Sequence, residues 1–282
     1  MSVLLSLCAI WGFTQVAIKV GNAGIPPFLQ AGLRSAGSAL LVWAYAGTRG
    51  VPLFRRDGSL GFGTLIAALF AGEFVFLYWG LVYTTAARGI LFIYTSPFVV
   101  ALGAHWFIPG ERLRGLRIAG LCCAFAGLVL AFADGLRLPT YRELLGDGME
   151  FLAAVLWGST TVVIKASPHR LSPHKTLFYQ LAGSAPILMA LAWLAGEPAR
   201  ARALPLPLAS LAFQIVVVAF ASYLTWFWLL GRYPAAPLAA FSFWTPIFGM
   251  LAGWLVLGEA VTPALAAAIL LVAAGIYVVN QA

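Results

Sequence analysis

The chain has 282 residues, of which 62% are hydrophobic and only 9% are charged. A water-soluble domain carries about a quarter charged residues, so this composition excludes an ordinary soluble protein. The formal net charge of +8 is basic enough to suggest a nucleic-acid partner, but no basic stripe or stacking platform stands outside the apolar segments. The remaining class is a protein embedded in a lipid bilayer, without a nucleic-acid partner.

Ten apolar segments follow one another along the chain, each near the length of about twenty residues that crosses a bilayer as a helix. The predicted spans are residues 2–21, 27–46, 61–82, 88–108, 114–133, 147–166, 174–195, 208–230, 235–257 and 263–280. The runs are uninterrupted and show no apolar/polar alternation, which excludes a β-barrel. The first run begins beside Met1 without a basic leader, and we interpret it as a retained span. The predicted fold class is therefore an all-α polytopic membrane protein with ten transmembrane helices.

The loop cations predict the orientation of these spans. If both termini lie on one face, that face carries most of the loop Lys and Arg residues, including Arg49, Arg55 and Arg112. The opposite face has fewer, among them Lys19 and Arg137. Because cytoplasmic loops carry the excess of Lys and Arg, we predict a multi-pass protein of the cell inner membrane with both termini cytoplasmic.

Residues of the first half recur in order in the second half. Trp11-Gly12 recurs as Trp157-Gly158, Phe28-Leu29-Gln30 as Phe178-Tyr179-Gln180, Pro97-Phe98 as Pro246-Ile247, and Gly110-Glu111 as Gly258-Glu259. We predict a tandem duplication, with one five-helix repeat at residues 1–140 and a second at 141–282. Because five is odd, the second repeat enters the membrane from the opposite side. Inverted repeats of this kind are typical of secondary transporters that work by alternating access.

Two corresponding segments resemble the EamA-type domain of the drug/metabolite transporter superfamily. One is Tyr94-Thr95-Ser96-Pro97-Phe98 continuing through Gly110-Glu111-Arg112, and the other is Phe243-Trp244-Thr245-Pro246-Ile247 continuing through Gly258-Glu259. Within that superfamily, the aromatic richness and the length are most similar to the YddG-type aromatic amino acid exporters. The resemblance implies a ten-helix exporter of small metabolites with a central cavity. One departure is Ser184 where the first repeat has Arg34, so the repeat fold itself does not require Arg34.

Matching interruptions in the two repeats are the best sequence indication of a transport site. Pro97 and Pro246 stand mid-span, where proline removes a backbone hydrogen bond and kinks a helix. Gly12 and Gly158 stand mid-span where the backbone can bend or approach another helix closely. We predict that these four positions are helix breaks or gating points. The backbone carbonyls that they leave unbonded could accept hydrogen bonds from a substrate ammonium group. The alternative is that they shape packing alone.

Aromatic side chains cluster around these positions and predict a cavity lining. The candidates are Tyr78, Trp79, Tyr83, Tyr94, Trp157 and Trp244. Aromatic rings stack on flat apolar side chains and attract cations to their faces. The alternative is a role in packing or at the lipid surface. Gln15 and Ser242 are further candidate substrate ligands, although such groups can also hydrogen-bond between helices.

Glu73 is the only acid that the predicted spans place deep in the membrane, at nearly the depth of Arg34. A charged group there costs several kcal/mol unless it faces water or a partner. Three interpretations remain open: a structural pair with Arg34, a proton-coupling carboxylate, and a ligand for a substrate amine. Two other acids, Glu111 and Glu259, fall where helices begin, and we predict that they complement helix N-termini.

The predicted function is export of amino acids, aromatic ones favoured, by alternating access through an aromatic-lined cavity. The alternative is proton-coupled export of cationic drugs using Glu73. An enzyme is disfavoured because the acids are scattered, and a channel because no ring of charges or filter-like segment occurs. The sequence has no Gly-rich nucleotide-binding loop, and its three cysteines lack metal-ligand spacing, so no cofactor or metal is predicted. Ten helices suffice for a complete pathway in a monomer.

Overall fold

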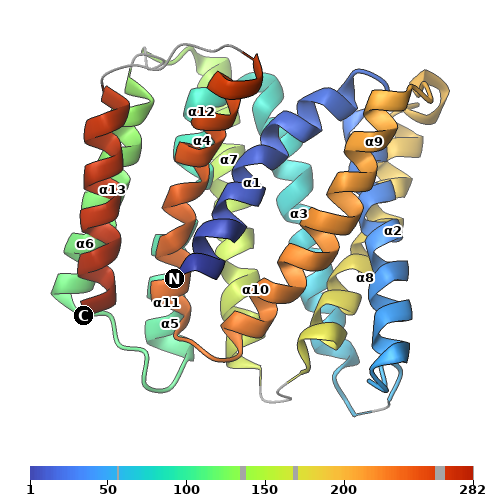
Figure 1. Ribbon diagram of the computed structural model, residues 1–282, viewed down its shortest axis with the longest axis horizontal. Coiled ribbons are helices and arrows are strands. Elements are labelled where there is room, and N and C mark those ends of the chain that lie inside the picture. Colours follow the sequence, from blue (N-terminus) through green and yellow to red (C-terminus); the bar gives the residue numbers. More distant parts are fainter. Residues whose placement is uncertain (56, 134–137, 168–170, 258–263, 282) are drawn as a thin grey trace. The chain divides into compact units, whose positions relative to one another are not determined.

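The computed structural model describes residues 1–282 apart from 56, 134–137, 168–170, 258–263 and 282, and it leaves out the side chains of residues 15, 86, 87, 253, 256, 257 and 264. All regular structure in the described part is helical (Figure 1). The elements are α1 (Ser2–Asn22), α2 (Pro27–Thr48), α3 (Leu60–Tyr83), α4 (Ala86–Ile93), α5 (Ser96–Phe107), α6 (Gly115–Ala131), α7 (Tyr141–Ala166), α8 (Pro173–Leu194), the short 3-10 helix η2 (Pro198–Arg200), α9 (Pro205–Phe213), the π-helix η3 (Gln214–Ser222), α10 (Tyr223–Leu230), α11 (Ala235–Ala240), the 3-10 helix η4 (Phe241–Phe243), α12 (Trp244–Leu257) and α13 (Ala264–Gln281).

These elements form ten apolar helical segments, which confirms the predicted fold class. Three of the segments are composite: α4 with α5, α9 with η3 and α10, and α11 with η4 and α12. Seven segments of the described chain are long and apolar enough to cross a membrane, and α6 and α13 are shorter apolar helices. Helix α2 is equally long, but Gln30 and Arg34 interrupt its apolar run.

Helix α7 begins at Tyr141, whereas the sequence predicted a span from 147. A capping box explains the earlier start. The Thr140 hydroxyl accepts a hydrogen bond from the Glu143 backbone N–H, and the Glu143 carboxylate accepts one from the Thr140 N–H at 2.8 Å. This reciprocal arrangement satisfies N–H groups that a helix start otherwise leaves unpaired. The first turn therefore lies well outside the apolar run.

The helices group into two compact units, each of which takes helices from both halves of the sequence. Unit 1 comprises residues 1–13, 75–166 and 233–282, and unit 2 comprises 14–74 and 167–232. Helix α6 packs along α13 in unit 1, and α2 packs along α8 in unit 2. Each of these pairs joins the corresponding spans of the two sequence halves.

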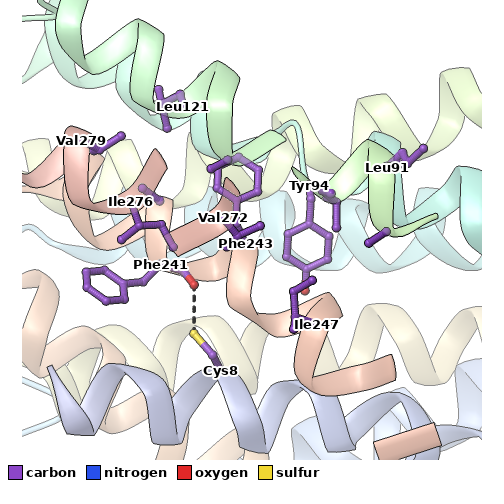
Figure 2. Packing of buried hydrophobic residues seen from close by; sticks show 14 of the residues in the cluster. Cys8, Leu91, Tyr94, Leu121, Phe241, Phe243, Ile247, Val272, Ile276 and Val279 are labelled. Atoms are coloured by element: carbon purple, nitrogen blue, oxygen red, sulfur yellow. Dashed lines mark hydrogen bonds between the residues drawn. The ribbon is translucent and has the colours of Figure 1, made fainter. Parts of the chain in front are cut away.

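Glycines let the backbones of α6 and α13 touch in unit 1. A Cβ atom placed on Gly275 would stand 2.4 Å from the Ala124 nitrogen and 2.5 Å from the Gly120 oxygen. One placed on Gly120 would stand 2.7 Å from the Gly275 oxygen. In lipid, where helices gain little from the hydrophobic effect, such close van der Waals packing holds helices together. Figure 2 shows the adjoining core, in which Leu121 and Val272 lie near Phe243.

Unit 2 has a comparable close contact and also buried polar bonds between its helices. A Cβ atom on Gly183 of α8 would stand 2.4 Å from the Ala67 Cβ of α3. The Gln214 amide donates to the Gln30 amide oxygen at 2.7 Å, between η3 and α2. The Glu197 carboxylate accepts from the Leu29 backbone N–H at 2.7 Å and so caps the start of α2.

Candidate functional site

The fourth span is interrupted at the residues that the sequence singled out. Helix α4 ends at Ile93 and α5 begins at Ser96, with Pro97 in the first turn of α5. Proline fits this position because the first N–H groups of a helix have no intrahelical acceptor. The Thr95 hydroxyl donates to the Phe92 carbonyl at 2.6 Å, which occupies one of the carbonyls that the interruption exposes.

The ninth span changes geometry rather than stopping. Helix α11 passes into the 3-10 turn Phe241–Phe243, and α12 starts at Trp244 with Pro246 as its third residue. The buried Ser242 hydroxyl donates to the Ala239 carbonyl at 2.7 Å within its own segment. The Cys8 thiol donates to the Phe241 carbonyl at 3.2 Å, which links α1 to this turn (Figure 2).

Gly12 and Gly158 do not interrupt their helices; they bring other helices close. Helices α1 and α7 run through these positions without a break. A Cβ atom on Gly12 would stand 2.8 Å from the Thr245 oxygen and 2.8 Å from the Phe248 Cβ. The corresponding atom on Gly158 would stand 3.2 Å from the Ser96 oxygen and 2.7 Å from the Val99 Cβ. The two contacts are equivalent: Gly12 of the first half meets the ninth span, and Gly158 of the second half meets the fourth span.

The six candidate aromatic residues all belong to unit 1 but have different surroundings. Tyr94 is buried and meets Trp157 edge to face, with ring centroids 5.8 Å apart (Figure 2 shows Tyr94). Trp244 is half-buried, and its ring lies 6.0 Å from that of Phe248.

Tyr78 is half-buried, Trp79 is 46% exposed, and Tyr83 is exposed beneath the Arg142 guanidinium, 5.9 Å from its ring centroid. The structure therefore brings Tyr94 and Trp157 together. Among the described residues, no recorded ring contact joins Tyr83 to Tyr94 or Trp157. The Gln15 side chain lies outside the described residues.

Arg34 is the most unusual polar residue of unit 2. It is only 1% exposed, yet its Nε and Nη2 atoms have no hydrogen-bond partner in the described part of the chain. Its guanidinium carbon lies 4.3 Å from the centroid of the Phe74 ring, a cation–π contact. A buried cation with donors left over is costly unless a partner arrives. The site is therefore suited to an incoming anion.

Glu73, on α3 beside Phe74, interacts electrostatically with Arg34 and is buried. No ion pair within 4 Å joins the two side chains among the residues that the structure describes. Tyr223 on α10 is half-buried and lies within electrostatic range of both. Phe70 connects these groups, with its ring centroid 4.8 Å from that of Phe74 and 6.3 Å from that of Tyr223. We call this group of residues the Arg34 site.

The sequence reading missed a second set of acids in unit 1. The prediction took Glu73 for the only acid deep in a span, because the predicted span began at 147 and put Asp147 and Glu150 in its first turn. In the structure α7 begins at Tyr141, and both acids lie well inside the helix and are buried. Their exposures are 2% and 1%. Their spacing from Glu143, by one and then two turns, places all three on one helix face. That spacing and the Thr-x-x-Glu capping signal were both present in the sequence.

The chain is similar to a family of membrane transporters and to several of its members. The model of the EamA-like transporter family matches residues 1–133 and 144–281. The "Uncharacterized transporter YoaV" of Bacillus subtilis is 25% identical over 97% of this chain and 94% of its own length. A "Probable amino-acid metabolite efflux pump" of Salmonella typhimurium and one of Escherichia coli are each 27% identical, over 97% of this chain and 92% of theirs.

A solved structure, titled only "Crystal structure of protein", aligns with a TM-score of 0.85 over 99% of this chain and 96% of its own, at 23% identity. At that identity the likeness establishes the fold alone. The family match, in contrast, spans nearly the whole chain and excludes an enzyme, because the members are multi-pass membrane transporters of small molecules. The chain belongs to the EamA-like transporter family.

Proposed function

We propose that this transporter exports amino acids, with aromatic ones favoured, across the inner membrane. The Arg34 site carries the proposal. An amino acid presents a carboxylate and an ammonium group a few bonds apart, and Arg34 and Glu73 present the complementary charges without neutralising one another in an ion pair. A guanidinium matches a carboxylate through two parallel hydrogen bonds, and Arg34 has two buried nitrogens without acceptors.

The aromatic preference is supported by what surrounds these charges. The Phe74 ring lies against the Arg34 guanidinium, and the Phe70 ring packs against both Phe74 and Tyr223. Tyr223 lies within electrostatic range of Arg34 and Glu73. A flat side chain gains from edge-to-face or offset packing against such rings. The names of the Salmonella typhimurium and Escherichia coli relatives also favour amino-acid metabolites. The closer likeness to the YddG-type exporters is part of the same proposal.

The mechanism we propose is alternating access by two inverted five-helix repeats, residues 1–140 and 141–282, in a monomer with both termini cytoplasmic. The two segments matched by the family model support the duplication. So does the exchange of contacts between Gly12 with Thr245 and Gly158 with Ser96. In a two-state transporter these contacts would act as pivots, and the interruptions at Pro97 and Pro246 as gates. The candidate lining residues Tyr94, Trp157 and Trp244 would then face the pathway.

Counterflow in proteoliposomes tests the substrate. Vesicles loaded with unlabelled phenylalanine should accumulate labelled phenylalanine, and Arg34→Lys should lower the rate at subsaturating substrate by about tenfold or more, because Lys cannot form the forked pair. Arg202→Lys, at an exposed loop position, is the matched control and should leave the rate unchanged. No accumulation above protein-free vesicles would reject the amino-acid assignment.

The alternative, proton-coupled export of cationic drugs through Glu73, is favoured by one observation: this buried carboxylate has no cation within ion-pair distance in the described residues. The two proposals differ in what competes for transport. Phenethylamine has the ring and the ammonium group of phenylalanine but no carboxylate. It should compete poorly if Arg34 binds substrate, and as well as phenylalanine if Glu73 alone does. Glu73→Gln should abolish pH-dependent efflux only in the second case.

A further inference from the structure

We propose that Glu150, in unit 1, is a proton-binding residue that loads and releases a proton during each transport cycle, so that export is coupled to proton movement. This inference rests on the proposed transport function. It concerns a different residue, helix and unit from the Arg34 site.

Two glycines form the niche that holds this carboxyl group. A Cβ atom placed on Gly80 of α3 would stand 2.8 Å from the Glu150 Oε1 atom, and one on Gly89 of α4 would stand 3.5 Å from it. Any larger residue at Gly80 would displace the carboxyl. Helices α4 and α7 lie side by side here (Figure 1), and a glycine on α7, Gly146, brings α7 within contact of the Gly80 oxygen as well.

Within this niche the Glu150 Oε1 atom accepts no hydrogen bond from the described residues. The residue is 1% exposed, and its Oε1 atom is buried without a hydrogen-bond partner in the described part of the chain. A buried charge without partners is among the costliest arrangements in a protein, and such a group usually neutralises itself instead. An ionisable residue inside a membrane span is also a functional candidate by default.

The cation of the neighbouring helix α4, Arg88, is already paired. Arg88 of α4 donates through Nε to both oxygens of Asp147 at 3.1 and 3.2 Å, and its Nη2 atom forms an ion pair with the same carboxylate. Thr84 donates to Asp147 at 2.6 Å. Asp147 lies one turn before Glu150, so it presents a negative charge rather than a compensating one. Arg88 interacts electrostatically with Asp147 and with Glu143, so its charge is already compensated. A proton on Glu150 avoids a further buried negative charge beside Asp147.

The remaining groups around this site supply no further cation in contact with Glu150 among the described residues, and Glu143 lies within electrostatic range of Arg88. On α7, Glu143 is engaged with Thr140 in the capping box, and Arg142 stacks on Tyr83 at the end of α3. Helix α5 carries one titratable side chain, His105, which is exposed and accepts a bond from the Leu113 N–H. Helix α11, Ala235–Ala240, has no titratable residue.

The proton step needs no further reactant. The neutral Glu150 carboxyl gives its proton to water when the niche opens to one face, and its O–H bond breaks to leave a carboxylate. The carboxylate takes a proton from water on the other face before the niche closes. Proton movement is coupled to substrate transport if the protein cannot bind substrate while the Glu150 niche is closed.

Chemical labelling of the wild-type protein tests whether Glu150 holds a proton. Dicyclohexylcarbodiimide is apolar and adds to protonated carboxyl groups in the membrane to give a stable N-acylurea, which mass spectrometry locates. We expect an adduct at Glu150 that decreases as the pH is raised from mildly acidic to alkaline, and none at Asp147. Absence of the Glu150 adduct over this whole range would overturn the proposal.

Flux under an imposed pH gradient tests the coupling. The wild-type rate of phenylalanine efflux should change several-fold with the gradient. Glu150→Gln, which imitates the protonated state, should lose that dependence and keep counterflow exchange. Glu143→Gln removes a carboxyl from the same helix face and should behave as wild type. A Glu150→Gln protein whose efflux responds to the gradient like the wild type would also overturn the proposal. If this variant does not fold, the labelling result decides.

The two proposals fail differently. Without phenylalanine flux, but with pH-dependent labelling of Glu150, the substrate assignment is wrong and the proton site stands. With phenylalanine flux that ignores the pH gradient in the wild type, the substrate assignment stands and proton coupling through Glu150 is wrong.

Discussion

The Lys175 ammonium of α8 donates to the Asp57 carboxylate at 2.7 Å and to the Arg55 carbonyl at 3.0 Å. Asp57 in turn accepts hydrogen bonds from the backbone and the hydroxyl of Ser59, just before α3. The loop that joins α2 to α3 is thereby fastened to the start of α8. The hydrogen bond from Lys175, followed by those from Ser59, holds the pKa of the Asp57 carboxyl well below its ordinary value.

The first prediction is the pH dependence of stability that this pair produces. Because the folded-state pKa of Asp57 is depressed, its stabilising effect is complete above the unfolded value of about 3.9 and is lost as the pH falls towards the folded value. Asp57→Asn should therefore melt at a lower temperature than the wild type near neutral pH. The difference between the two should shrink below about pH 4. Thermal unfolding in detergent across acidic pH measures both. A difference that grows on acidification would contradict the sign.

The second prediction concerns the Arg88–Asp147 pair. Both side chains are largely buried, with 11% and 3% of their surface exposed. Asp147→Asn leaves the Arg88 cation in place without its counter-charge, and breaking a buried pair from one side costs about 3 to 5 kcal/mol. The double substitution Arg88→Met with Asp147→Leu removes both charges and should recover much of that loss. Thermal unfolding of the three proteins is the measurement. A double variant less stable than Asp147→Asn would show that the charges themselves stabilise the unit.

The third prediction distinguishes two roles of glycine: allowing two helices to touch, and adding backbone freedom to the unfolded chain. Gly275→Ala should destabilise unit 1 by about 1 to 3 kcal/mol, because the added methyl group meets the backbone of α6. Gly148→Ala, in α7, is the matched control: its Cβ atom would have no neighbour within 4 Å. There the loss of backbone freedom in the unfolded chain should give a small gain of about 0.5 to 1 kcal/mol. Equal effects of the two substitutions would show that the α6–α13 contact is not as tight as described.

The spans could be predicted from the sequence because each depends on a local property, a run of apolar residues long enough to cross a bilayer. The interruption near Pro97 is also local, since proline acts on its own helix. The π-helix at Gln214–Ser222 has no such signal: its residues are apolar throughout apart from the ends, as in neighbouring helices. π-helical geometry often marks functional positions, and no residue type within this segment predicts it.

The partners of the polar residues could not be predicted, since they depend on which helices meet. Glu111 was expected to complement the start of a nearby helix. Its carboxylate instead accepts from the Ala235 and Ala236 N–H groups, at 2.8 to 3.3 Å, and so caps α11 in the other half of the chain. The expectation for Glu259 lies outside the described residues. For Glu150, the sequence shows a carboxyl group but not the niche that Gly80 and Gly89 build around it.

The fourth prediction tests the proposed topology by labelling single cysteines in a protein without its native ones. Cys8 should be replaced by Ser, which retains a donor for the Phe241 carbonyl, and Cys122 and Cys123 by Ala. Cysteines at Ser2 and Gln281, both exposed, should react with a membrane-impermeant maleimide only in inverted vesicles. One at Ala23, exposed after the first span, should react only in intact cells.

The reason for this expectation is that ten crossings would return the chain to its starting face, and the larger share of loop Lys and Arg predicts that this face is cytoplasmic. Reaction of Ser2 and Gln281 from opposite sides would require an odd number of crossings. Two five-helix repeats of opposite orientation would then be impossible, and the matching contacts of Gly12 and Gly158 would need another explanation. If the cysteines at Ser2 and Gln281 both react from outside, the inverted repeats are retained and only their orientation in the membrane is reversed. The cysteine at Ala23 should then react from the cytoplasmic side, so it is the deciding control.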